Sequence, residues 1–232
     1  MNPQKLNHLN KEFYETCARY WNNAADYEWR GWAKLPLEGL STPLRVCDLG
    51  CGSGRFAHFL TREVGPEVEY LGMDFADFYV DHARTHKPNI IRSYKIIQQD
   101  LFTQRWEFNG EVDLVVAFGL IHHLPPAFGP HFFTELRRRF TARTLGIITT
   151  WQYLDNPRLA KKILSEHPLQ VGGPDNILAW TRGEYGERYS HFWTKQEVVR
   201  ECARYGFAAT YLPEPSAAEN GLNNYFLLRL SS

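Results

Sequence analysis

The sequence predicts an α/β fold in which helices cover both faces of a mostly parallel β-sheet. Three observations lead to this prediction. The length of 232 residues suits one domain with its own core. Short apolar runs alternate with amphipathic helical patterns over most of the chain, which is typical of strands joined by crossover helices. A glycine-rich turn follows the first apolar run and precedes a helical pattern.

The elements follow in order from these patterns. Residues 3–33 are expected to form a helix, because apolar side chains recur at every third or fourth position. Gly31 and Pro36 mark its end. The alternating core is then expected to contain five strands with three helices between them: strands at 44–50, 68–73, 94–99, 113–118 and 145–151, and helices at 55–64, 76–85 and 128–140.

The pattern becomes less regular after residue 151. A short helix is expected at 157–166, and a longer one at 194–205. Thr194 is the expected N-cap of the longer helix and Glu197 follows three residues later, as in a capping box. The chain is expected to end in two strands that are joined by a loop containing Pro213, Pro215 and Gly221: residues 208–212 and 225–230.

No composition shift marks a domain boundary, so one domain over residues 1–232 is expected. Segments outside the alternating core are where such folds carry specificity. The domain divides into a helical N-terminal cap, a core, an insertion on the substrate side and a C-terminal part: residues 1–40, 44–151, 152–193 and 194–232.

Composition narrows the class of protein. Lys and Arg number 26 and Asp and Glu number 26, which argues against a strongly cationic nucleic-acid binder. No apolar run resembles a signal peptide or a membrane span, so a cytoplasmic protein without membrane contact is expected. The four cysteines have no zinc-like spacing and are expected to be reduced, mostly buried thiols, with no metal site: Cys17, Cys47, Cys51 and Cys202.

The glycine-rich turn reads Gly50-Cys51-Gly52-Ser53-Gly54. Glycines allow a sharp turn and a close approach of a ligand to the backbone, and the following helix offers free N–H groups. In a nicotinamide-type GxGxxG turn the third glycine would come one residue later. An acidic residue, Asp48, also comes directly before this turn.

Two more acids follow the next two expected strands. Asp74, which Phe75 follows, suits hydrogen bonds to both hydroxyls of a ribose. Asp100, which Leu101 follows, suits a hydrogen bond from an adenine amino group. The carboxyl ends of parallel strands are where open α/β sheets bind ligands, so these acids and the glycine turn are expected at one edge.

In these motifs, residues 44–151 resemble the class I S-adenosylmethionine-dependent methyltransferases. The resemblance implies a Rossmann-like, mostly parallel seven-stranded sheet with an antiparallel C-terminal hairpin strand. It also implies S-adenosylmethionine as cofactor and S-adenosylhomocysteine as product. A catalytically inert partner subunit would be expected to lack the cofactor acids, which are present here. The implied cofactor residues are Asp48, Gly50, Cys51, Gly52 and Gly54 at the methionine part, Asp74 and Phe75 at the ribose, Asp100 and Leu101 at the adenine, and Phe118 beside the methyl group.

Four further segments resemble the methyltransferases that esterify carboxymethyl-uridine at the wobble position of tRNA. The main ones are ERYSHFWTKQEV at 187–198 and IHHLP at 121–125. The chain departs from that family at Ala24-Ala25, where Thr-Arg is usual; Arg30 is a candidate replacement. The resemblance implies a tRNA acceptor. The alternative is a small-molecule O- or N-methyltransferase, which the neutral charge and the missing arginine favour. Eukaryotic relatives work with a zinc-containing partner protein, but nothing in this sequence indicates one.

Candidate catalytic residues depend on the acceptor. A carboxylate is already ionised at neutral pH and needs only a cation to hold its second oxygen, for which Arg188 and Arg30 are candidates. A hydroxyl or amine acceptor would be helped by a base, for which His122 and His191 are candidates. The alternative to a catalytic role is an ordinary surface position for the arginines and a turn-forming position for the histidines.

Arginines 137–139 and Arg143 form the strongest local cluster of charge. They are interpreted either as the solvated face of a helix or as a patch that contacts RNA phosphates. The aromatic residues of 180–193 have two readings as well, as stacking partners for an exposed base or as the core of a lid over a small substrate.

Overall fold

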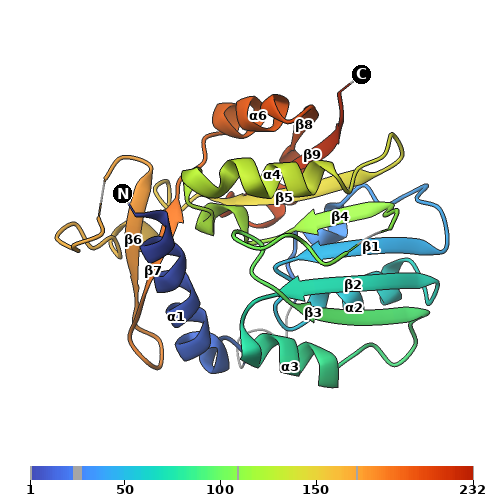
Figure 1. Ribbon diagram of the computed structural model, residues 1–232, viewed down its shortest axis with the longest axis horizontal. Helices are drawn as coiled ribbons and strands as arrows, with labels where there is room; N and C mark the ends of the chain where they lie inside the picture. The colour runs from blue at the N-terminus through green and yellow to red at the C-terminus, as the bar shows by residue number, and fades with distance from the viewer. Residues whose placement is uncertain (1, 23–27, 109, 171, 232) are drawn as a thin grey trace.

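A seven-stranded sheet forms the centre of the molecule in the computed structural model (Figure 1), which describes residues 2–22, 28–108, 110–170 and 172–231. The strand order is β3-β2-β1-β4-β5-β9-β8. The first five strands pair in parallel, and β9 runs antiparallel to both β5 and β8, which confirms the predicted fold class. The strands are β1 (Leu44–Leu49), β2 (Val68–Asp74), β3 (Ser93–Gln98), β4 (Leu114–Ala117), β5 (Leu145–Trp151), β8 (Phe207–Leu212) and β9 (Asn223–Leu230).

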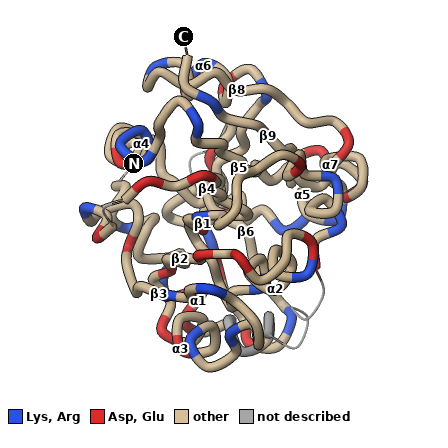
Figure 2. The backbone as a smooth tube through the Cα atoms, turned by 90° about the vertical axis from the view of Figure 1, so that its right-hand side faces the viewer, with Lys and Arg blue, Asp and Glu red and all other residues tan. Residues whose placement is uncertain are grey.

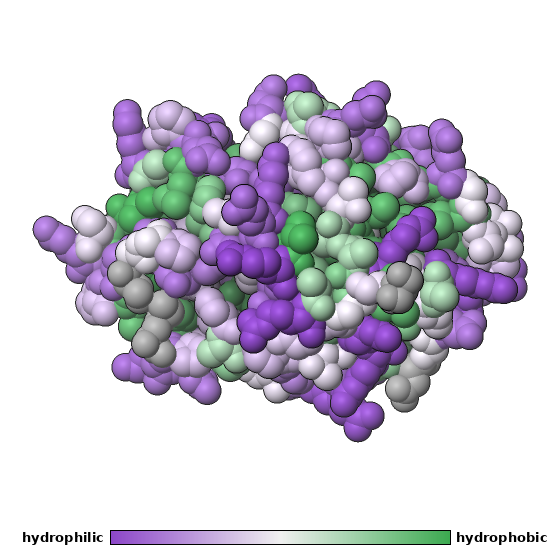
Figure 3. All heavy atoms as spheres, turned by 90° about the horizontal axis from the view of Figure 1, so that it is seen from above, coloured by the Kyte–Doolittle hydropathy of each residue, from purple (hydrophilic) through white to green (hydrophobic). Residues whose placement is uncertain are grey.

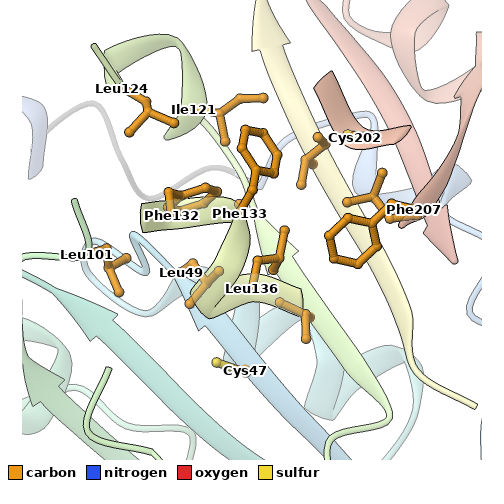
Figure 4. Close-up of a cluster of buried hydrophobic side chains, with 14 of the residues drawn as sticks. Cys47, Leu49, Leu101, Ile121, Leu124, Phe132, Phe133, Leu136, Cys202 and Phe207 are labelled. Carbon is orange, nitrogen blue, oxygen red and sulfur yellow. The ribbon is translucent and has the colours of Figure 1, made fainter. Parts of the chain in front are cut away.

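Helices cover both faces of this sheet. On one face lie α4 (Gly129–Arg137) and α6 (Lys195–Arg204), whose apolar side chains form a buried cluster with the sheet (Figure 4). On the other face, α2 (Arg55–Glu63) and α3 (Asp77–Thr85) form a second cluster. A doubly covered sheet explains why the residues of β4 and β5 are buried on every position, without alternation.

A third group of elements lies beyond the carboxyl ends of the parallel strands, toward which the arrowheads of Figure 1 point. It consists of α1 (Pro3–Asn22) and an antiparallel hairpin of β6 (Asp175–Trp180) and β7 (Gly186–His191). Helix α1 packs against both β7 and α3. The edge that holds the predicted cofactor residues is therefore covered by the N-terminal cap and the 152–193 insertion. Short helices complete the fold: η1 (Trp32–Lys34), η2 (Ile121–His123), η3 (Pro126–Phe128), α5 (Pro157–Ala160) and α7 (Pro213–Ala218).

Several predicted elements differ from the structure. Among the described residues, the N-terminal helix spans Pro3–Asn22 and does not reach residue 33, because the chain forms a separate 3₁₀ turn at Trp32–Lys34. Ala24 and Ala25, where the sequence departs from the tRNA-modifying family, lie outside the described residues. The predicted helix at 157–166 ends at Ala160, because Ile163 pairs with the edge of β6 instead.

Two further elements were missed. The insertion contains the β6–β7 hairpin, whose tight turn includes Gly183 at φ +79°. The expected loop after β8 begins with the helix α7, in which Pro213 occupies the first turn, where its missing N–H costs nothing.

Two other expectations are confirmed, the capping box and the buried thiols. Thr194 and Glu197 form the reciprocal hydrogen bonds of a capping box at the start of α6. The four cysteines are buried free thiols. Hydrophilic side chains predominate on the face around α6, with hydrophobic ones between them (Figure 3). No helix in the described ranges is both long and apolar enough to cross a lipid bilayer.

Candidate active site

The glycine-rich turn joins β1 to α2 and has the backbone that its sequence predicts. Gly50, Gly52 and Gly54 have φ angles of +72°, +52° and +79°. These values are in the left-handed region that favours glycine. At Gly54 the space is also filled, since a Cβ there would lie 2.5 Å from the hydroxyl oxygen of Tyr94. The turn brings Cys51 against Gly72 of β2 and directs the N-terminus of α2 toward the carboxyl edge of the sheet.

Asp48 is buried at the end of β1. The Tyr70 hydroxyl donates a hydrogen bond of 2.5 Å to its Oδ2. Burial raises the pKa of Asp48 to about 7; Tyr70 opposes this rise, and the nearby Asp74 adds to it. A cationic group placed against this carboxyl would favour its ionised form.

Asp74 ends β2 and holds the glycine turn in place. Its Oδ2 accepts a hydrogen bond of 2.9 Å from the Gly52 N–H, and its Oδ1 accepts one of 3.0 Å from the Ala76 N–H. Burial raises its pKa, and these backbone donors oppose the rise. The structure thus brings the first two predicted acids and the glycine turn together.

Asp100 follows β3 and is engaged by α1. Its Oδ2 lies 2.8 Å from Lys11 Nζ and accepts a hydrogen bond of 3.0 Å from Asn7 Nδ2. Burial raises the pKa of Asp100, but the Lys11 ammonium and the hydrogen bond from Thr103 lower it by more. The pKa of Asp100 is therefore below its ordinary value. The acid expected at the adenine therefore also anchors the helix that covers the site.

The apolar residues predicted at the cofactor divide into two groups. Phe75 lies under α1, with its ring centre 6.1 Å from that of Tyr14 and 6.0 Å from Lys11 Nζ. Leu101 packs into the core under α4 (Figure 4). Phe118 packs edge-to-face on Phe56 of α2, in the opposite core cluster.

Arg188 of β7 is buried in a group of aromatic side chains at the carboxyl ends of β4 and β5. Its guanidinium carbon lies 4.6 Å from the ring centre of Trp151, 5.0 Å from Phe13 and 5.7 Å from Trp180. Burial lowers the pKa of Arg188, while its hydrogen bond with Tyr14 raises it. An arginine stays protonated at neutral pH even so. The site therefore contains a buried positive charge bounded by rings.

His122 and His123 lie beside this arginine in η2 and are both buried. His123 bonds to Tyr14 Oη through Nε2, at 2.7 Å, and to the Tyr189 carbonyl through Nδ1, at 2.8 Å. Since a carbonyl only accepts, Nδ1 carries the proton and Nε2 accepts from the tyrosine. His122 Nδ1 is buried and has no hydrogen-bond partner among the described residues.

Both histidines are neutral at physiological pH. Burial, with a contribution from the Arg188 charge, lowers the pKa of His123 to about 3. Burial and the charges of His123 and Arg188 lower the pKa of His122 well below its ordinary value. His122 can therefore donate or accept a hydrogen bond, but gaining a proton would place a second cation beside Arg188.

The structure does not group His191 with these residues. Strand alternation directs it to the face of β7 opposite Arg188. Its Nδ1 lies 2.9 Å from Asp175 Oδ1 at the start of β6, and its ring packs on Trp193. Arg30, the proposed replacement for a missing family arginine, is exposed before η1.

The arginine cluster lies at the other edge of the sheet. It follows α4 and precedes β5, and so lies at the amino ends of the strands. Arg138 and Arg139 both pair with Glu135, and Arg139 is buried against Trp106. Among the described residues, no group of three or more His, Cys, Asp and Glu side chains is arranged to hold a metal ion.

Sequence reasoning missed the residues that α1 contributes to the site. Tyr14 contacts His123 and Arg188, and Lys11 pairs with Asp100. The helical periodicity predicted a buried face but gave no sign that polar side chains on this helix meet residues about 100 positions away.

The comparisons with known proteins agree with this geometry. Residues 46–142 match the family described as a methyltransferase domain. No curated protein sequence is similar enough to be recognised as a relative.

Three solved structures illustrate the shared fold. DhpI with SAM and HEP has a TM-score of 0.71 at 15% identity and covers 99% of this chain and 100% of its own. A TehB-like SAM-dependent methyltransferase from Corynebacterium glutamicum scores 0.63 at 16% identity, covering 96% and 100%. The glycopeptide N-methyltransferase MtfA with sinefungin scores 0.63 at 15% identity, covering 90% and 89%.

The fold and site define a class I methyltransferase architecture, and the domain match falls on the segment with the glycine turn and the strand-end acids. The chain thus combines the fold of S-adenosylmethionine-dependent methyltransferase structures with a methyltransferase-domain match over residues 46–142.

Proposed function

We propose that this enzyme transfers a methyl group to an oxygen that is already ionised at neutral pH, on a small acidic molecule. One observation carries the proposal: the buried Arg188 guanidinium, surrounded by Trp151, Phe13 and Trp180, beside the carboxyl ends of β4 and β5. An anionic acceptor would add charge compensation and paired hydrogen bonds to the ring contacts and the Tyr14 hydrogen bond that this guanidinium already has.

The neighbouring histidines support an acceptor that needs no deprotonation. An alcohol or amine would have to lose a proton to a base. His122 is a poor proton acceptor because its pKa is well below its ordinary value, and His123 uses Nε2 to accept from Tyr14. A carboxylate or another acidic oxyanion avoids this requirement.

The chain's own residues fit the cofactor and suggest a division of roles. Asp48 would hold the amino group of its methionine part, and Asp74 would hold its ribose. The glycine turn and the N-terminus of α2 would lie against the cofactor with their backbone. The bound cofactor supplies an electrophilic methyl group on a positively charged sulfur. Arg188 would hold one acceptor oxygen and so orient the other toward the methyl carbon, with α1 and the β6–β7 hairpin excluding water. His122 would orient the acceptor by a hydrogen bond.

The electron balance of this transfer needs no base. A lone pair of the acceptor oxygen forms the new O–C bond, and the electrons of the broken S–C bond remain on sulfur. The positive charge of the sulfonium and the negative charge of the methylated oxygen would cancel on transfer, leaving an ester and a thioether.

A carboxymethyl-modified wobble uridine in tRNA also presents a carboxylate and is the second candidate. The sequence likeness at 187–198 supports it, because that segment contains Arg188. The arginine cluster does not add support, since Arg138 and Arg139 are engaged with Glu135 at the far edge of the sheet. The small acid is the candidate that the geometry favours.

The test is methyl transfer from labelled S-adenosylmethionine to a pool of small carboxylic and phosphonic acids, and in parallel to bulk tRNA with and without ribonuclease. We expect label in a small, base-labile ester. Label that is ribonuclease-sensitive would instead establish the tRNA acceptor, and label stable to base would refute a carboxylate as the acceptor.

The variants Arg188→Gln and Arg188→Lys test the assigned cation. Arg188→Gln should lower kcat/KM for the acceptor by at least about tenfold, the loss expected of a hydrogen bond to a charged group, while S-adenosylhomocysteine binding stays unchanged. Arg188→Lys should restore part of that loss. Arg143→Gln, at the exposed far edge, is the matched control. Equal kcat/KM in all three variants would refute the role.

A further inference from the structure

Trp180, at the end of β6, is surrounded by positive charges. Lys162 Nζ lies 5.2 Å from its ring centre, and the guanidinium carbons of Arg188 and Arg182 lie 5.7 Å and 6.0 Å from it. Lys162 follows α5, and Arg182 is in the turn between β6 and β7, so three separate segments bring these cations to one ring. Figure 2, seen from the end of the molecule opposite the hairpin, shows Lys and Arg segments near α5 with Asp and Glu segments close by.

These cations interact electrostatically with one another. The pKa of Lys162 is lowered by burial and by the charges of Arg188, Arg182 and Arg158. Among the described residues, no carboxylate forms an ion pair with Lys162, Arg182 or Arg158. Like charges this close repel each other, so the arrangement is destabilising until an anion joins it.

Two acids close to Arg182 in the sequence are engaged elsewhere. The Glu187 carboxylate pairs with His167 and accepts a hydrogen bond from Tyr185. The Glu184 carboxylate accepts one from Tyr20. Among the described residues, Glu184 and Glu187 therefore do not form ion pairs with the cations near Trp180.

Lys162, Arg182 and Arg158 with the Trp180 ring are called the Trp180 surface here. We propose that the Trp180 surface binds a second anionic group of the methyl acceptor, a carboxylate or a phosphate, while Arg188 holds the group that is methylated. This inference rests on the proposed function for its account of Arg188. The acceptor would then carry two negative charges before methylation and one afterwards.

The geometry limits the size of such a molecule. Lys162 and Arg188 both lie near the same indole, so their charged groups are within about 11 Å of one another. A small dicarboxylic acid or a phosphorylated carboxylic acid spans this distance. Because Arg188 is buried whereas Arg158 and Arg182 are exposed, the second group would lie nearer to the surface.

The direct test measures anion binding without methyl transfer. Protein saturated with S-adenosylhomocysteine is titrated calorimetrically with citrate, with inorganic pyrophosphate and with acetate. We expect citrate and pyrophosphate to bind, and the double variant Lys162→Gln/Arg182→Gln to weaken both at least tenfold. Lys87→Gln, an exposed lysine after α3, should leave both unchanged. Equal affinities in the wild type and the double variant would overturn the inference.

Two further arms separate the inference from its premises. The first arm titrates a single-stranded oligoribonucleotide. If the double variant binds it more weakly but binds citrate and pyrophosphate as tightly as the wild type does, the surface is assigned to RNA and a small acceptor is overturned. If Arg188→Gln keeps full kcat/KM while the double variant still loses citrate binding, the proposed function fails but the anion site stands. Circular dichroism and the thermal midpoint identify a variant that has not folded. In that event, the charge-conserving pair Lys162→Arg and Arg182→Lys serves instead, and it should retain binding to within about threefold.

Discussion

Asp48 makes the stability of the cofactor-free enzyme depend on pH in an unusual direction. Burial raises its pKa from the ordinary 3.8 to about 7. The folded state therefore holds this proton more tightly than the unfolded state does. Stability from this group is fully present below about pH 4, falls as pH rises and is lost above about pH 7. Each pH unit in this interval costs up to about 1.4 kcal/mol.

The perturbation that isolates this effect is Asp48→Asn, which keeps the shape of the side chain and an oxygen that can accept from Tyr70. Between pH 5 and pH 8, the free energy of unfolding of the wild type should fall by about 2.5 kcal/mol relative to the variant. Chemical denaturation of both proteins at pH 5, 6, 7 and 8 measures this difference. Other titrating groups are common to both proteins and largely cancel.

Cofactor binding gives the same carboxyl a second test. If the amino group of S-adenosylhomocysteine pairs with ionised Asp48, affinity for it should rise about tenfold between pH 6 and pH 8, with proton release at the lower pH. Asp48→Asn should bind more weakly and with little dependence on pH. A stability difference that stays constant across the pH series would refute the raised pKa, and a flat affinity in the wild type would refute the pairing.

Three smaller perturbations test the scaffold by denaturant unfolding. Gly54→Ala should cost at least about 2 kcal/mol, because the residue has φ +79° and the added Cβ meets the Tyr94 hydroxyl; a loss below about 0.5 kcal/mol would contradict that close contact. Thr194→Ala should cost about 1 kcal/mol by removing the side-chain cap of α6, and no loss would mean the cap is redundant. Lys11→Met should cost about 1 kcal/mol at pH 7. Because the pKa of Asp100 is lowered in the folded state, this loss should begin to shrink as pH falls below about 4 and vanish once Asp100 is protonated in the folded state as well; a loss that stays constant on acidification would exclude the ion pair as its cause.

The cofactor half of the site could be predicted from sequence because its determinants are local. The glycine turn needs left-handed backbone at fixed positions, and a parallel sheet brings the ends of successive strands to one edge. Asp48, Asp74 and Gly52 therefore meet as expected, through a hydrogen bond of 2.9 Å between the last two.

On the acceptor side, Arg188 and His122 could be named from the sequence, but the contacts around them could not, because these contacts join distant parts of the chain. The Asn10 side chain of α1 accepts a hydrogen bond from the Tyr189 N–H, 179 positions away. The strands of the hairpin carry no alternation, since Ile177 and Leu178 are both buried, as are Arg188 and Tyr189. A buried arginine in a polar stretch reads as a surface residue until the aromatic side chains around it are known.

The zero net charge conceals a separation of charge within the site. Asp48 and Asp74 lie at the ends of β1 and β2, where the cofactor is expected, and Arg188 and Lys162 lie across from them on the side of the hairpin. Such a field attracts a cationic methyl donor to one side and an anionic acceptor to the other. Under the proposed reaction the sulfonium charge and the charge of the methylated oxygen vanish on transfer, so the products lose that part of the attraction that held the reactants. The same arrangement of charges would thus strengthen the binding of the substrates and weaken the binding of the products, without a conformational change.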